Sequence, residues 1–146
     1  MANNQDMSER KDDPSRIASL YGLTPKVETA INHAVMNGEK RRARILMAPL
    51  HPADQADLIE RLPMEVAANL VRMLGDDLDA ETLTHLNEQT RDEIVDVMGM
   101  AALARQLPDL PTDDALNIVE ELEQDERADV LAALPAEDRV LVEEGL

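Results

Sequence analysis

Residues 46–75 read LMAPLHPADQADLIERLPMEVAANLVRMLG, and three times in this stretch a pair of apolar residues is followed three positions later by a leucine. The pattern returns every twelve residues. Apolar side chains at such spacings share one side of an α-helix. Pro63 and Gly75, which follow two of the closing leucines, interrupt helices because proline lacks an N–H and glycine lacks a Cβ. The stretch therefore predicts helices of about eight residues, each followed by a turn.

The twelve-residue register continues to the last residue without an insertion. Its closing position is always a long aliphatic residue: Leu50, Leu62, Leu74, Leu86, Met98, Leu110, Leu122, Leu134 and Leu146. The series through Met47 is broken only by Glu143, the series through Leu46 only by Thr82 and Gln106, and the series through Ala56 is mostly small. Helices this short are only marginally stable alone and must pack against neighbouring helices. We predict an all-α superhelix, an α-solenoid with a twelve-residue repeat, over residues 16–146, after a polar and disordered leader at residues 1–15.

The charge is unevenly distributed along the chain. Residues 1–44 hold eight basic and six acidic residues, whereas residues 45–146 hold six basic and 25 acidic ones. The whole chain has a net charge of −17 and a single aromatic residue, Tyr21, so nucleic-acid binding is excluded as a function. There is no cysteine for a disulfide or a thiolate metal site. No apolar run approaches the ~20 residues of a membrane-spanning helix.

Nothing in the sequence predicts an enzyme. The three serines lie within the first 19 residues, and the three histidines show no zinc-binding spacing. Asp77, Asp79, Glu81 and Glu88 have the spacing of a calcium-binding EF-hand loop. Threonine replaces the required glycine at its sixth position, and the segment falls in the helical register, so we reject that interpretation.

Acidic and basic residues also follow the register. Five of eight positions in the predicted first helical turns are acidic: Glu65, Asp77, Asp113, Asp125 and Glu137. Carboxylates there oppose the positive end of the helix dipole, which accounts for most of the acidity. The one basic cluster is Lys40, Arg41, Arg42 and Arg44. Two interpretations of it stay open: a solvated helix face, or a surface for acidic protein or lipid headgroups.

Two segments resemble a known family. LHPADQADLIERLP (50–63) and PTDDALNIVEELEQDERADVLAALPAEDR (111–139) are similar to the N-terminal cytoplasmic domain of MgtE-type magnesium transporters, and the resemblance covers roughly residues 26–146. It implies a regulatory domain at the cytoplasmic face of the inner (plasma) membrane, followed in the same polypeptide by CBS domains and a membrane pore. It also implies a homodimer, in which weakly bound Mg²⁺ between this domain and the CBS domains favours the closed pore.

The resemblance carries four residues over as metal ligands. Glu81 in DAETLTHL and Asp113 in PTDDALNIV match acidic ligand positions of the family. Asn117 stands where the family can have aspartate, and Asp114 is an adjacent alternative. Asparagine offers an oxygen without charge, which implies a weaker or displaced ion. Apart from the resemblance, Glu81 is a polar residue at a helix edge and Asp113 a first-turn acid.

The chain stops at Leu146, before any CBS or membrane segment, so we expect either a fragment of a transporter or a standalone relative. The competing hypothesis is a helical-repeat scaffold similar to the flagellar motor switch protein. Such a scaffold would bind a protein partner on its concave surface without a divalent ion. The first hypothesis predicts a response to Mg²⁺, whereas the scaffold hypothesis predicts none.

Overall fold

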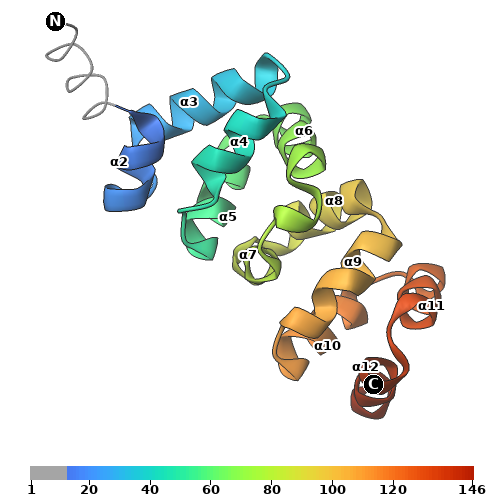
Figure 1. Cartoon of the computed structure of the whole chain (residues 1–146). Helices are drawn as coiled ribbons and strands as arrows, with labels where there is room; N and C mark the ends of the chain where they lie inside the picture. Colours follow the sequence, from blue (N-terminus) through green and yellow to red (C-terminus); the bar gives the residue numbers. More distant parts are fainter. Residues whose placement is uncertain (1–12) are drawn as a thin grey trace, which may run out of the picture. The chain divides into compact units, whose positions relative to one another are not determined.

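The computed structural model describes residues 13–146, and Figure 1 shows a succession of short helices joined by tight turns. These residues form no strand, so the predicted all-α fold is confirmed. Residues 1–12 of the predicted leader lie outside the described residues. Its last three residues begin the first described helix, whose N-cap is Asp13. The chain divides into two compact units, Met1–Asp77 and Leu78–Leu146.

The helices of both units are short. The first unit contains α2 (Pro14–Tyr21), α3 (Pro25–Met36), α4 (Lys40–Met47), α5 (Pro52–Arg61), α6 (Met64–Leu74) and the 3₁₀ turn η1 (Gly75–Asp77). The second unit contains α7 (Ala80–His85), α8 (Glu88–Met98), α9 (Met100–Gln106), the 3₁₀ turn η2 (Leu107–Asp109), α10 (Thr112–Glu121), α11 (Gln124–Ala133) and α12 (Ala136–Gly145). Within the described part of the chain, no helix is long and apolar enough to span a bilayer.

The twelve-residue register decides where helices begin. From α4 onward, eight helices begin at residues 40, 52, 64, 88, 100, 112, 124 and 136. The remaining helix, α7, begins at Ala80 rather than at residue 76. Gly75 ends α6 with a φ of 53°, and the Asp79 side chain accepts a hydrogen bond from the backbone N–H of Glu81. A left-handed glycine and a late aspartate cap therefore shorten this one helix.

Residues that directly follow the closing positions of the register begin the next helix. Pro63, Pro111 and Pro135 are N-cap residues of the helices that follow them. Asn87 caps α8, and its Oδ1 accepts a hydrogen bond from the backbone N–H of Thr90 at 2.9 Å. These residues therefore both end one helix and begin the next.

The core of the first unit follows the predicted apolar positions. Helix α4 packs against α3 and α6, α2 packs against α3 and α4, and α5 packs against α6. The three main series of the repeat supply this core: Leu46, Met47, Leu50, Leu58, Ile59, Leu62, Leu70, Val71 and Leu74 are all buried. The core prediction is confirmed for this unit.

Polar side chains also occupy core positions. Thr82 and Gln106 interrupt the series through Leu46, yet both are buried. Gln106 Nε2 donates a hydrogen bond to the carbonyl oxygen of Leu78 at 3.0 Å. Gln55 is also buried, and its Nε2 donates to the carbonyls of Met47 and Leu50 at 3.1 and 3.3 Å. Each glutamine satisfies a carbonyl that a helix end or turn would leave unpaired.

The second unit is packed around α9 and α10. Helix α9 packs against α8 and α11, while α10 packs against η2, α11 and α12. The burial of apolar side chains declines toward the C-terminus: α11 buries only Val130 and α12 only Val142. Leu146, in the closing series, is exposed. The last repeats therefore keep the register but bury less of their apolar surface.

Candidate metal-binding residues

Three of the four predicted metal ligands lie on α10. Pro111 caps this helix, and Ala115, Ile118 and Val119 form its buried side. Asp113 and Asp114 lie in the first turn; Asp113 is exposed and Asp114 is half-buried. Asn117 is exposed and lies four positions after Asp113, so the two share one face of α10.

Glu81, the fourth predicted ligand, lies on α7. It is the second residue of the helix, and its side chain is exposed. Its backbone is fixed at both ends: its N–H donates to Asp79 Oδ1 at 3.0 Å, and its carbonyl accepts from Thr84 Oγ1 at 2.7 Å. Because residues 80–85 are helical, the segment is not a calcium-binding loop, in agreement with the rejection of that interpretation.

The donor atoms of these four residues fit the preferences of Mg²⁺. Magnesium prefers oxygen ligands, keeps several waters and takes one or two carboxylates from a protein. Within residues 13–146, no three histidine, cysteine, aspartate or glutamate side chains gather closely enough to hold a metal ion. Asp113 and Asn117 therefore offer a partial set of ligands, which water or another surface would have to complete.

Two other carboxylates of the second unit lie together, a contact that the sequence did not predict. Asp96 of α8 and Glu126 of α11 interact through their side chains. The backbone N–H of Glu123 lowers the pKa of Glu126, but burial, the charge of Asp96 and a hydrogen bond with Asp96 outweigh it and raise this pKa above its ordinary value. The separation of Asp96 and Glu126 is not a whole number of repeats, so the register gave no signal that they meet.

The basic cluster divides into two parts in the structure. Arg44 Nε donates to the carbonyl oxygen of Met73 at 3.0 Å and forms an ion pair with Asp77 at 3.2 Å. Lys40, Arg41 and Arg42 are exposed. One of the four residues therefore has a structural role inside the first unit, and three face solvent.

Comparison with known proteins gives two findings. Residues 50–146 match the family described as MgtE intracellular N domain. The fold is similar to that of a solved structure titled "Crystal structure of the soluble part of a magnesium transporter", with a TM-score of 0.70 and 19% sequence identity. That likeness covers 82% of this chain and 47% of the other, so this chain corresponds to about half of that structure.

No match was found among curated proteins. The structural likeness, at its low identity, supports the fold, while the family match rests on the sequence itself. That match covers about two thirds of the chain and includes all four predicted ligands. The chain belongs to the MgtE intracellular N domain family.

Proposed function

We propose that this chain is the cytoplasmic regulatory domain of a magnesium transporter and that it senses Mg²⁺ through Glu81, Asp113, Asp114 and Asn117. The observation that carries the proposal is the family match over residues 50–146. The exposed oxygen donors on α7 and α10 support it, because their chemistry suits a hard cation that keeps its water. The family is named for a domain of a transporter and not for an enzyme.

The proposed sensing mechanism is electrostatic. Residues 78–146 contain 19 of the 31 acidic residues and four of the 14 basic ones, a net charge of −15. A second acidic surface would be repelled by this unit until divalent ions bound between the two. The CBS domains that the family resemblance implies are the proposed second surface. An ion that binds the closed arrangement more tightly than the open one shifts the equilibrium toward the closed pore.

The position of the ligands on α10 supports weak binding. Asp113 and Asp114 lie in the first turn, beside the positive end of the helix dipole. That end stabilises the carboxylates but opposes a cation placed next to them. Asn117 contributes an oxygen without a charge. Weak binding suits a sensor that must release its ion when the Mg²⁺ concentration falls.

A magnesium titration of the chain followed by amide NMR tests this proposal. Ionic strength is held constant with a monovalent salt while MgCl₂ is raised through the millimolar range. We expect saturable shifts at the amides of Glu81 and Asp113 and at neighbouring amides in α7 and α10. The Asp113→Asn substitution should weaken the response of α10, because it removes one of the two adjacent carboxylates.

Asp125→Asn provides a matched control for this titration. Asp125 occupies the same register position on α11 as Asp113 does on α10, and both side chains are exposed. The control should leave the α7 and α10 shifts unchanged. Shifts that follow ionic strength alone, or that are equally sensitive to both substitutions, would contradict the sensor and favour the protein-interaction scaffold.

A further inference from the structure

Helix α4 carries positive charge that the first unit does not use internally. Arg44 is bound to Met73 and Asp77, as described above. The side chains of Lys40, Arg41 and Arg42 are exposed and form no ion pair or hydrogen bond with residues 13–146. Three uncompensated cations on one short helix are unexpected in a chain with a net charge of −17.

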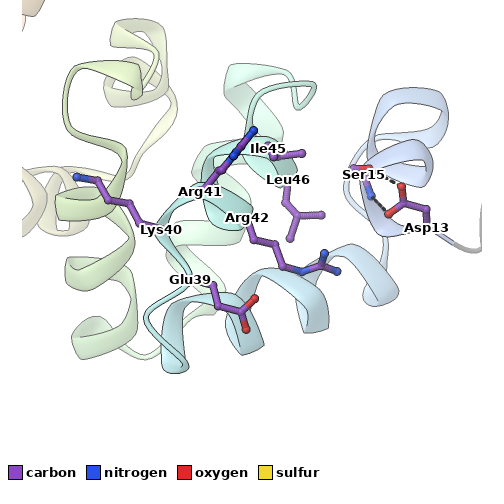
Figure 2. Close-up of a pocket in the computed structure, with 8 residues that line it drawn as sticks. All are labelled: Asp13, Ser15, Glu39, Lys40, Arg41, Arg42, Ile45 and Leu46. Carbon is purple, nitrogen blue, oxygen red and sulfur yellow. Dashed lines mark hydrogen bonds between the residues drawn. The ribbon is translucent and has the colours of Figure 1, made fainter.

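The exposed face of α4 combines these cations with an apolar side chain. Ala43, Leu46 and Met47 form the buried side of the helix. Arg41 and Ile45, four positions apart, lie on the opposite side, and Ile45 is 51% exposed. Figure 2 shows Lys40 extending to one side of the helix and Arg42 to the other. The outward face therefore has a half-exposed isoleucine at its centre and positive charge around it.

The surface beside this face is hollow and only lightly acidic. A pocket of about 480 Å³ opens next to α4, with Arg42 and Ile45 in its wall (Figure 2). Two acidic side chains, Asp13 and Glu39, also line it. Asp13 is engaged in its own helix cap, because Ser15 Oγ donates to Asp13 Oδ2 at 2.8 Å. Lys40, Arg41 and Arg42 thus outnumber the acids that face the same space.

We propose that the outward face of α4 docks on the anionic surface of a lipid bilayer. The three cations diverge, so they do not converge on one compact anion, but each can meet its own headgroup on a continuous charged surface. Ile45 can enter the boundary between headgroups and acyl chains while the long basic side chains extend back to the phosphates. A bilayer has an apolar layer beneath its charge, which a soluble acidic peptide lacks.

The charge of the remaining chain makes this docking selective. Residues 78–146, with a net charge of −15, are repelled by the same anionic surface that attracts α4. An anionic surface should therefore bind the α4 face in preference to residues 78–146. The inference does not depend on magnesium sensing, since it uses none of the proposed metal ligands.

Sedimentation of the chain with vesicles tests the proposal. Vesicles of phosphatidylcholine with about a third phosphatidylglycerol are compared with pure phosphatidylcholine, without divalent ions and at about 0.1 M salt, where the screening length is about 10 Å. We expect binding to the anionic vesicles only, with loss of binding in high salt. Each of Lys40→Ala, Arg41→Ala and Arg42→Ala should lower the partition coefficient about fivefold, and the triple variant about a hundredfold.

Two control substitutions separate this face from general charge and apolarity. Arg72→Ala removes one exposed positive charge from α6 in the same unit and should change the binding little. Ile45→Ser should weaken binding, whereas Met36→Ser, at an even more exposed apolar residue of α3, should not. Circular dichroism of each variant verifies that the helices remain folded.

Three outcomes would overturn the proposal. The triple variant could bind anionic vesicles as well as the unchanged chain. Polyglutamate could bind the α4 face in a salt-dependent manner while vesicles do not, which would identify an acidic polypeptide as the occupant. The triple variant could instead abolish a concentration-dependent self-association measured by light scattering, with no vesicle binding, which would identify a second copy of this chain.

Discussion

The two compact units are built on the same twelve-residue register but differ sharply in charge. Residues 1–77 contain 12 acidic and ten basic residues, a net charge of −2, while residues 78–146 have a net charge of −15. The last two helices of the second unit also bury less than helices of the first. Helix α6 buries five residues, whereas α11 and α12 bury one each. The register therefore determines where helices form, but not how many side chains each helix buries.

The high negative charge of residues 78–146 affects the stability of the second unit. A first-turn acid is locally favourable in every repeat, but 19 acids in 69 residues repel one another across the whole unit. A strongly acidic unit gains stability from any cation that screens its charge. The magnesium sensing proposed above would make use of that property.

The largest expected effect is in the core. Leu70 is fully buried on α6, and Leu70→Ala should lower the free energy of unfolding by about 2–5 kcal/mol because it leaves a cavity. Val142 occupies the same register position on α12, and Val142→Ala should cost only about 1–2 kcal/mol, because it removes fewer methyl groups from a helix that buries only this residue. Urea unfolding compares the two. Equal costs would contradict the expected difference between α6 and α12.

The buried glutamines provide the next contrast. Gln55 bonds two carbonyls, so Gln55→Leu should destabilise the chain by about 1–3 kcal/mol, because the Leu50 carbonyl loses this buried partner and the Met47 carbonyl keeps only its bond from the backbone N–H of Leu50. Gln106 bonds one carbonyl, and its Oε1 has no hydrogen-bond partner within the described residues. Gln106→Leu removes this unpaired oxygen and restores the apolar series, so it should cost clearly less. Urea unfolding of both variants tests the order, and a larger cost for Gln106→Leu would contradict it.

Salt should affect the two units differently. Raising NaCl from about 0.05 to 0.5 M shortens the screening length several-fold, which relieves repulsion within residues 78–146. Amide hydrogen exchange should therefore slow in α8–α12 and change little in α3–α6. Sucrose at matched viscosity serves as an uncharged control. A uniform change across both units would show that charge does not distinguish their stability.

Particular residues show how far sequence reasoning could go. Threonine followed by proline is typical of a helix start, and Thr24 Oγ1 accepts from the backbone N–H of Val27 at 3.3 Å, with Pro25 at the first position of α3. A helix cap depends on residues that are adjacent in the sequence, so it can be predicted from the sequence alone. The burial of Gln106 and the pairing of Arg44 with Asp77 depend on residues from other repeats. For the same reason, a ligand set completed by another surface cannot be derived from this chain alone, and the four metal ligands stay a prediction.

The smallest expected effect concerns the ionisation of Glu126, a single carboxyl group in the second unit. Its pKa in the folded chain is raised above the ordinary value of 4.5, so the folded state binds the proton more tightly than the unfolded state does. The stability that this provides is fully present below the unfolded pKa and is lost as pH rises through the folded pKa. Above that window Glu126 is charged beside Asp96, and the charge disfavours the folded state.

Glu126→Gln should therefore stabilise the chain slightly at neutral pH, with a gain that disappears as the pH is lowered through the window. The glutamine oxygen can still accept the hydrogen bond from the backbone N–H of Glu123, so the capping interaction at 3.3 Å is kept. Carbon-13 NMR of the Glu126 carboxyl should give a titration midpoint above 4.5, and Asp96→Asn should lower it. Asp129→Asn, an exposed change on the same helix, should leave that midpoint nearly unchanged. If Asp129→Asn lowers the midpoint as much as Asp96→Asn, the shift comes from the charge of the whole unit and not from the meeting of α8 with α11.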